Sequence, residues 1–190
     1  NAEIITVNYT YPFDGDFGFA PNFPKGLVIK QEVFSNKGNQ TLQTSGQAYV
    51  FDLVGNVKNV YEFNKGEGSN SANLLYIPPN YESRTLFFFF YGHQVQVTPV
   101  QGVANSYIWS KKDGQLLAKI EGVARNSIPA HLITAVENAS YTGLYAKLKD
   151  LQAFVLDGMV TGLIYKPLAG VEIIIDPKGD ETKYEYDGFG

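Results

Sequence analysis

The chain opens with Asn1-Ala2-Glu3-Ile4-Ile5-Thr6-Val7-Asn8-Tyr9-Thr10-Tyr11, an extended stretch that Pro12 ends. Side chains alternate between the two faces of a β-strand, so the apolar residues of this stretch share one face and the polar ones the other. The apolar face carries Ile5, Val7, Tyr9 and Tyr11. This pattern predicts a strand that needs a sheet to pair with, and we divide the chain into an arm, residues 1–12, and a globular domain, residues 13–190.

No methionine precedes Asn1. Removal of a secretory signal leaves such an end, so we expect a mature, exported chain with an extracellular, cell-surface location. The sequence contains no cysteine, which excludes a disulfide framework and thiolate chemistry. We therefore expect the protein to gain its stability from packing, from hydrogen bonds or from another chain.

Charged residues make up 18% of the chain, below the roughly 25% that is usual in soluble domains. A largely neutral, polar surface suits an extracellular or acidic setting, where carboxylates protonate and charge no longer ensures solubility. The net charge of -4, with scattered lysines, argues against nucleic-acid binding. No apolar run reaches the roughly 20 residues of a membrane-spanning helix, so we expect no membrane span in the mature chain.

Gly, Pro, Asn and Asp clusters divide the chain into short stretches rich in Val, Ile, Tyr, Phe and Thr, which is typical of all-β proteins. The pattern predicts an Ig-like or jelly-roll-like β-sandwich with an N-terminal extended donor strand and one or two short helices. The expected strands cover residues 3–11, 26–34, 46–54, 57–63, 73–77, 84–91, 93–100, 103–109, 115–123, 154–165, 170–176 and 181–186.

Three segments between or within these strands have a distinct character. Residues 12–25 are too rich in Pro and Gly for a regular element, and we expect a hinge or collar loop pinned by Phe13, Phe17, Phe19 and Phe23. The polar residues 64–71 predict a hairpin tip or surface loop. Residues 86–91 are apolar on both faces, so we expect that strand to be covered on both sides, as a central core strand or at a subunit interface.

One region, residues 128–152, has helical character. Ser127 is expected to cap a turn, with Pro129 just inside it. Leu144, Leu148 and Leu151 recur at helical spacing. We expect one or two short helices here, crossing the end of the sandwich.

Three Asn-X-Ser/Thr sequences mark candidate glycosylation sites at Asn8, Asn39 and Asn138. Each can accept an N-glycan in an exported protein whose host has the machinery. Asn39 lies in a Gly-containing turn and Asn8 lies on the polar face of the arm, so a glycan at either position projects outward. Chance alone also produces such sequences in a chain this rich in Asn, Ser and Thr.

The titratable residues show no pattern typical of a catalytic or metal site. His93 and His131 lie far apart in the sequence, and a zinc site would need both of them together with carboxylates. The acidic groups around Asp14 and Asp176 offer oxygen ligands to calcium, but neither has EF-hand spacing and turn-forming Asp is commoner. We find no nucleophile elbow, catalytic triad or phosphate-binding loop, and we expect no enzyme, cofactor or metal. Trp109 is expected in the core rather than as a sugar platform.

The C-terminal region combines Val160-Thr161-Gly162-Leu163-Ile164-Tyr165 with Pro167-Leu168-Ala169-Gly170-Val171-Glu172-Ile173, followed by Gly179, Thr182 and Asp187-Gly188-Phe189. This region alone resembles the carboxypeptidase regulatory-like or Cna-B-like β-sandwich repeat. The resemblance implies a secreted, Ig-like, noncatalytic module of surface proteins and fibres. In such modules a closing strand follows the Gly-Phe turn, whereas this chain stops at Gly190, so the resemblance implies that one strand position is left open.

The exported end, the low charge, the glycosylation sequences and the Tyr- and Asn-rich β body are similar to those of secreted archaeal thread and pilus subunits. That resemblance implies donor-strand assembly, in which the arm of one subunit fills the incomplete sandwich of the next. Head-to-tail contacts of this kind join identical subunits into a filament when the rotation does not close. The donor-strand residues are Ile4, Ile5, Thr6, Val7, Tyr9 and Tyr11.

We therefore expect a structural subunit of an adhesive cell-surface filament, with an acceptor groove that includes residues 87–91 and the C-terminal strands. Three alternatives remain open. The arm can pair within its own sheet, as first strands often do. The chain can instead be a secreted carbohydrate- or surface-binding module with exposed aromatic residues, or a viral coat or tail protein with the same β architecture.

Overall fold

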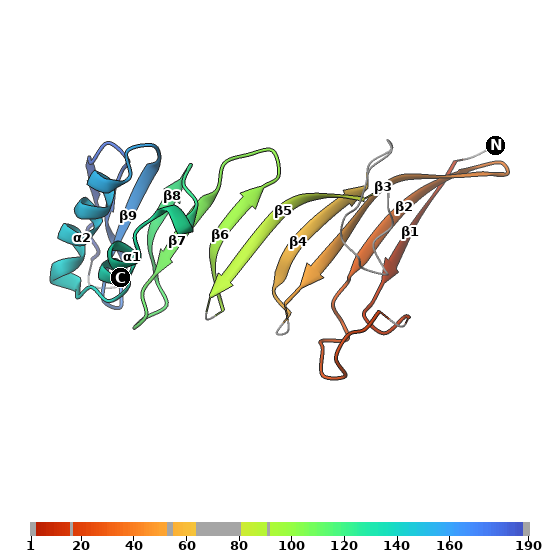
Figure 1. Cartoon of the computed structure of the whole chain (residues 1–190), viewed down its shortest axis with the longest axis horizontal. Helices are drawn as coiled ribbons and strands as arrows, with labels where there is room; N and C mark the ends of the chain where they lie inside the picture. The colour runs from red at the N-terminus through yellow and green to blue at the C-terminus, as the bar shows by residue number, and fades with distance from the viewer. Residues whose placement is uncertain (1–2, 16, 53–54, 64–80, 91, 188–190) are drawn as a thin grey trace. The chain divides into compact units, whose positions relative to one another are not determined.

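The structure, a computed structural model, describes residues 3–15, 17–52, 55–63, 81–90 and 92–187. This part of the chain is mostly β, and its strands are antiparallel neighbours in sequence order from β1 to β11. Figure 1 labels the first nine of them. The chain divides into two compact units, Asn1–Phe87 and Phe88–Gly190. The all-β prediction is confirmed at this level. The boundary predicted between arm and domain at residue 12 is a functional division and stays a prediction.

Unit 1 is built from hairpins. Its strands are β1 (Ile4–Thr10), β2 (Lys30–Lys37), β3 (Gln40–Phe51), β4 (Val57–Phe63) and the first part of β5 (Tyr81–Phe90). The turn between β2 and β3 consists of Gly38 and Asn39, and Gly38 has a φ of 63°, a backbone conformation that glycine adopts without strain. The expected strand at residues 73–77 and the expected polar tip at residues 64–71 lie outside the described residues.

The buried core of unit 1 is small. Among the described residues it consists of Ile29, Ala48, Tyr61 and Tyr81. A Cβ added to Gly46 would lie only 2.1 Å from the Tyr81 hydroxyl oxygen, so glycine is required for this close approach. Gln43 Nε2 donates a hydrogen bond to that oxygen at 2.8 Å. Burial, with a smaller contribution from Glu32, raises the pKa of Tyr81 to about 12.

The loop before β2 is pinned largely as its phenylalanines predict. Phe23 is buried and its ring lies 4.6 Å from that of Phe19 and 6.0 Å from that of Phe51. Phe17 and Phe19 pack against the core of unit 1, whereas Phe13 is exposed, so the expectation is wrong for Phe13 alone.

Unit 2 combines a sheet with helices. Its elements after β5 are β6 (His93–Pro99), β7 (Asn105–Trp109), β8 (Leu116–Glu121), η1 (Arg125–Ser127), α1 (Ala130–Glu137), α2 (Tyr141–Phe154), β9 (Met159–Lys166), β10 (Gly170–Ile175) and β11 (Glu181–Lys183). Helix α2 packs on β9, and α1 contacts α2 and β7 (Figure 1). The predicted stripe of Leu144, Leu148 and Leu151 is confirmed, since all three are buried in the core of this unit.

Close contacts and caps explain how α2 is placed. A Cβ added to Gly162 of β9 would lie 3.0 Å from Leu148 Cδ1, so the glycine allows the helix to approach the strand. Ser140 caps α2, its Oγ accepting a hydrogen bond from the Gly143 N–H at 3.3 Å. The Tyr145 hydroxyl donates to Glu181 Oε1 at 2.6 Å, and this bond, with Lys183 nearby, lowers the pKa of Glu181.

Several sequence-based expectations in unit 2 are corrected. Ser127 ends η1 instead of capping a turn, and Pro129 is the residue before α1 with no side-chain cap. The strand expected from residue 154 begins at Met159, because α2 continues to Phe154. Helix α2 contacts β9 and helix α1 contacts β7, whereas the sandwich whose end the helices are expected to cross stays a prediction.

Candidate assembly site

The predicted donor strand forms β1 and pairs with β2 of its own chain. The antiparallel register runs from Ile4 opposite Asn36 to Thr10 opposite Lys30. Five of the predicted donor residues, Ile4, Ile5, Thr6, Val7 and Tyr9, lie in β1, and Tyr11 follows it directly. In the isolated chain, pairing within its own sheet is therefore what the structure shows.

The apolar side chains of this strand are exposed to solvent despite the pairing. The exposed fractions are 57% for Ile5, 42% for Val7 and 52% for Tyr9, which all lie on one face, and 63% for Ile4 on the other. A strand normally gains its stability from burying at least one apolar face. Strand β1 buries neither face within its own chain, so most of the hydrophobic stabilisation that its side chains offer is not realised there.

β1 also lies at an edge of the sheet, because β2 is its single neighbour among the described strands. An exposed apolar edge strand is a template for pairing with another chain, and proteins usually block such edges with Lys, Pro or very short strands. β1 contains no charged residue and no proline. The strand at the other end of the order, β11, has three residues, and two of them are charged: Glu181 and Lys183. Of the two edge strands that the structure describes, β1 alone has the features of an association edge.

A few side-chain bonds hold β1 on β2. Asn36 Nδ2 donates to Thr6 Oγ1 at 2.9 Å, and the Ser35 hydroxyl donates to Glu3 Oε1. Both contacts are solvent-exposed, and exposed polar contacts contribute little net free energy.

The strand ends at a well-anchored turn. Pro12 is fully buried, and the Tyr11 N–H donates to Asp14 Oδ2 at 2.7 Å. The Asp14 N–H in turn donates to the Tyr11 carbonyl oxygen at 3.2 Å. Since Phe23 is also buried, the loop is anchored by buried side chains beyond this turn, whereas the apolar side chains of the strand before it are exposed.

The three glycosylation sequences occupy different environments. Asn8 is exposed in the middle of β1, and Asn39 is exposed in the β2–β3 turn. Asn138 is also exposed, but its Nδ2 donates to the Thr134 carbonyl oxygen at 2.9 Å and closes the end of α1. Ser140 of the same sequence caps α2. The two helix ends therefore explain the Asn138 sequence structurally, whereas no structural bond of the Asn8 or Asn39 side chains competes with a glycan among the contacts described here.

A groove of about 980 Å³ lies in unit 2 between the end of β5, β6 and α1. Its apolar wall includes Phe88, Val95, Ile128 and Ile133. Phe88 is 48% exposed and Phe90 is 52% exposed, so the prediction of a central core strand is wrong for these side chains. The predicted aromatic run instead exposes alternate side chains, Leu86, Phe88 and Phe90, while Phe87 and Phe89 are half-buried. Tyr91 lies outside the described residues.

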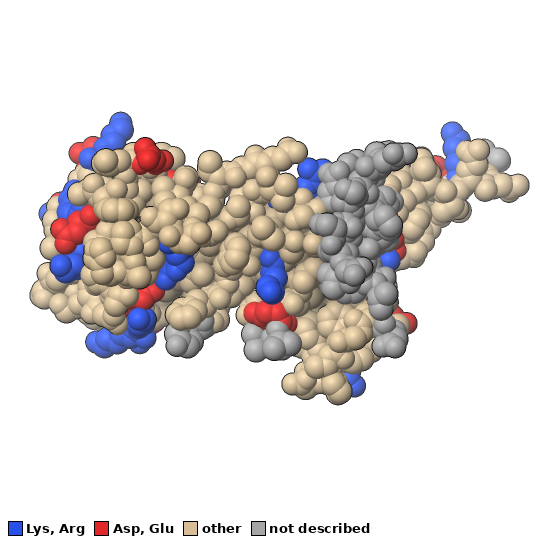
Figure 2. All heavy atoms as spheres, viewed as in Figure 1, with Lys and Arg blue, Asp and Glu red and all other residues tan. Residues whose placement is uncertain are grey.

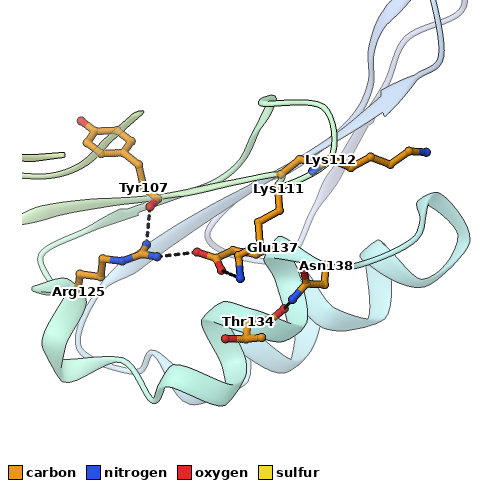
Figure 3. A network of polar contacts seen from close by, with 8 residues as sticks. Tyr107, Lys111, Lys112, Arg125, Thr134, Glu137 and Asn138 are labelled. Carbon is orange, nitrogen blue, oxygen red and sulfur yellow. Dashed lines mark hydrogen bonds and ion pairs between the residues drawn. The ribbon is translucent and has the colours of Figure 1, made fainter. Parts of the chain in front are cut away.

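A polar network lies at one side of the groove (Figure 3). Glu137 accepts from Arg125 Nη2 at 2.7 Å and pairs with Lys111 Nζ at 3.0 Å. Arg125 Nη1 donates to the Tyr107 carbonyl oxygen at 2.8 Å. Two cations thus compensate one nearly buried carboxylate. The sequence carries no signal for this network, because its members are brought together only by the fold.

The described part of the chain holds no other candidate site of the kinds sought in the sequence. No three His, Asp or Glu side chains converge there into a metal-binding group. Asp176 Oδ1 accepts from the N–H groups of Lys178 and Asp180, which is the turn-forming role of Asp. Trp109 is half-buried and stacks on His93 with ring centroids 4.8 Å apart. Neither α1 nor α2, the helices described, has the length and apolar character needed to cross a bilayer.

The surface is mostly uncharged. On the face shown in Figure 2, basic and acidic side chains are scattered among neutral ones without a continuous patch of one sign.

No known family model matches the chain, and no curated protein is similar enough to count as a relative. Both resemblances stated above therefore stay predictions.

Proposed function

We propose that the chain is a structural subunit of an extracellular, cell-surface filament, which polymerises head to tail by exchanging its N-terminal strand. The observation that supports this most is the state of β1: an uncharged edge strand with large apolar side chains exposed on both faces. Such a strand adds to a neighbouring sheet through main-chain hydrogen bonds, and its side chains provide the specificity.

Exchange of β1 between copies is energetically favourable for two reasons. The main-chain bonds that β1 gives up on leaving β2 are offset by main-chain bonds to the acceptor sheet of the neighbour. Covering Ile5, Val7 and Tyr9 contributes roughly half of the about 1.5–3 kcal/mol that burial of a fully exposed side chain gives, because each is already about half covered, before the entropy cost of association. The buried Pro12 anchors the end of the strand that stays with its own subunit during the exchange.

The proposal includes the predicted sandwich, the glycans and a role without a cofactor or enzymatic activity. The Ig-like or jelly-roll-like sandwich is completed when the strand of a neighbour covers the open apolar surface. Glycans at Asn8 and Asn39 suit the low surface charge, whereas a glycan at Asn138 competes with the hydrogen bond that ends α1. The chain acts without a cofactor and is not an enzyme. Both resemblances, to Cna-B-like repeats and to archaeal thread subunits, agree with this role.

Negative-stain electron microscopy tests the proposal. We compare the native chain with a variant in which Ile5, Val7 and Tyr9 are replaced by Thr, which keeps the strand propensity and removes the apolar surface. Leu42→Thr is the matched control, because Leu42 is equally exposed on β3 but lies outside the arm. We expect filaments from the native chain and the control, and none from the triple variant. Filaments that persist in the triple variant, or a native chain that stays monomeric, would exclude donor-strand polymerisation.

A further inference from the structure

Strands β6 and β7 of unit 2 form an incomplete ladder. Their antiparallel pairing consists of Gln96 opposite Ser106 and Val97 opposite Asn105, next to the loop that joins them. Continuation of this register would place Val95 opposite Tyr107 and His93 opposite Trp109. These further pairs are not formed within the described segment His93–Trp109. We call the part where these two strands are not paired with each other, residues 93–95 and 107–109, the seam; on its other side β7 is paired with β8.

Side chains take the place of the missing ladder bonds at the seam. Trp109 Nε1 donates to the Gln94 carbonyl oxygen at 2.7 Å. Arg125 Nη1 donates to the Tyr107 carbonyl oxygen at 2.8 Å, as Figure 3 shows. Buried main-chain carbonyls need a donor, and a strand normally provides it. Here, two carbonyl groups on strands that could continue their ladder are satisfied by long side chains instead. The main-chain N–H groups of an inserted strand can donate to both carbonyl oxygens in place of these two side chains.

Apolar surface surrounds the seam. The groove described above carries Phe88, Val95 and Ile133. A second hollow of about 430 Å³ is lined by Phe89, Tyr107 and Leu116. An inserted strand places alternate side chains on opposite faces, so its apolar residues would have surface to cover on either side of the seam.

From these observations we infer that the seam of unit 2 is the acceptor site for β1 of a second copy of this chain. This inference rests on the proposed function, because it names the partner surface of the same strand. β1 has the free edge, the exposed apolar side chains and the extended conformation that the seam requires.

Charge also favours β1 as the occupant. The charged residues that line the groove are Lys111, Arg125 and Glu137, and the single carboxylate is already paired with both cations. The groove therefore has a net positive charge and disfavours a basic segment. β1 is uncharged and Glu3 precedes it, so the arm of a second copy brings no positive charge beyond any at its terminus.

Cysteine cross-linking tests the inference in the full chain, which contains no cysteine of its own. One variant carries Val7→Cys in β1 and a second carries Gln94→Cys at the seam, and the two are mixed under mild oxidation. A disulfide needs Cα atoms within about 7 Å, so it reports seating of the strand. The control mixture pairs Val7→Cys with Leu156→Cys, because Leu156 is 84% exposed in unit 2 and outside the seam.

We expect the mixed disulfide with Gln94→Cys to exceed that with Leu156→Cys by about tenfold or more, through the raised effective concentration at the seam. Equal or absent cross-linking, while filaments still form and depend on the arm, would overturn the inference and leave the proposed function intact. Absence of both cross-links and filaments would overturn both. Thermal unfolding of each variant checks that it folds.

The single tryptophan provides an independent measurement that needs no cysteine. Trp109 donates its indole N–H across the seam, so insertion of a strand must change its environment and its emission. A synthetic peptide of residues 1–11 is titrated into the full chain, beside a control peptide carrying Ile5→Ser, Val7→Ser and Tyr9→Ser. We expect a saturable change with the first peptide only. The same emission with and without the first peptide would contradict binding at the seam.

Discussion

The two compact units of this chain cover their sheets in different ways. In unit 2, two helices pack on the strands, and fourteen side chains of the described residues form one buried cluster. In unit 1, the corresponding cluster has four members, and the first strand exposes its large apolar side chains. Both units are rich in apolar residues, so the difference among the described residues is that helices cover the sheet of unit 2 and none covers that of unit 1. A sheet that lacks one within the chain gains stability from a layer that a partner provides.

This comparison explains why assembly is proposed through β1. Under the proposal, unit 2, with its larger buried core, carries the acceptor, and the exposed strand of unit 1 is the donor. A subunit with two well-covered units would have little to gain from polymerisation. The following experiments test the contrast between covered and uncovered sheets, beginning with the largest expected effect.

Substitution at the interface of α2 and β9 should destabilise unit 2 strongly. Leu148 is fully buried and packs against Gly162, so Leu148→Ala leaves a cavity and lowers the free energy of unfolding by about 2–5 kcal/mol. Ile5→Ala in β1 should change the stability of the monomer by less than about 0.5 kcal/mol, since Ile5 is mostly exposed. Urea denaturation of the monomeric chain measures both. Similar losses for the two variants would show that the units do not differ in the way described.

The core of unit 1 should be sensitive at one position, the close approach of Gly46 to Tyr81. Gly46→Ala forces the Tyr81 hydroxyl away from its hydrogen bond with Gln43, and we expect a loss of about 1–3 kcal/mol. Hydrogen exchange of β3 and β4 measures this loss locally. Gly26→Ala is the control, because an added Cβ there meets no atom within 4 Å. Unchanged protection in Gly46→Ala would contradict the tight packing.

Loss of the α2 cap should have a smaller effect. Ser140→Ala removes the acceptor for the Gly143 N–H and should cost about 1 kcal/mol, whereas Ser140→Asp keeps an acceptor and most of the stability. Thermal unfolding of the two variants separates loss of the cap from a general effect of substitution. If both variants lose the same stability, the cap does not hold the helix.

Local patterns in the sequence predicted much of this fold, because they depend on a few neighbouring residues. The alternation in residues 3–11 indicated β1, residues 57–63 coincide with β4, and the leucine stripe indicated α2. The beginning of β9 was misplaced because the segment 154–158 after the stripe is apolar enough to resemble a strand. The partner of β1 was not predictable, because an exposed apolar strand pairs equally well by pattern with its own sheet or with another.

The features of unit 2 that carry the further inference were beyond sequence-based prediction. Arg125, Glu137 and Lys111 come from different elements and meet only in the folded chain. The incomplete ladder between β6 and β7 depends on where two strands diverge, which neither propensity nor periodicity encodes. The sequence shows that Phe88 and Phe90 are apolar, but whether they are buried or exposed depends on the three-dimensional arrangement.

The stability of the small core of unit 1 should depend on alkaline pH through Tyr81. Burial raises the pKa of Tyr81 from 10.0 to about 12, so the hydroxyl favours its neutral form in the folded chain. Below the unfolded pKa the side chain is neutral in both states and its contribution is fully present. As the pH rises through the folded pKa, the unfolded state is ionised and the contribution is lost. Stability should therefore fall between about pH 10 and pH 12.

Tyr81→Phe should reduce this alkaline loss, and urea denaturation at about pH 9 and about pH 11.5 measures it in both proteins. Tyr61, whose pKa burial also raises, leaves part of the loss in the variant. The variant should start slightly less stable near neutral pH, because the Gln43 amide loses its acceptor. The lost hydrogen bond lowers the stability of the variant, whereas the missing ionisable hydroxyl reduces its loss of stability at high pH. The difference in free energy of unfolding between the two proteins should therefore narrow as the pH rises. A constant difference across this range would show that Tyr81 does not titrate from a buried position.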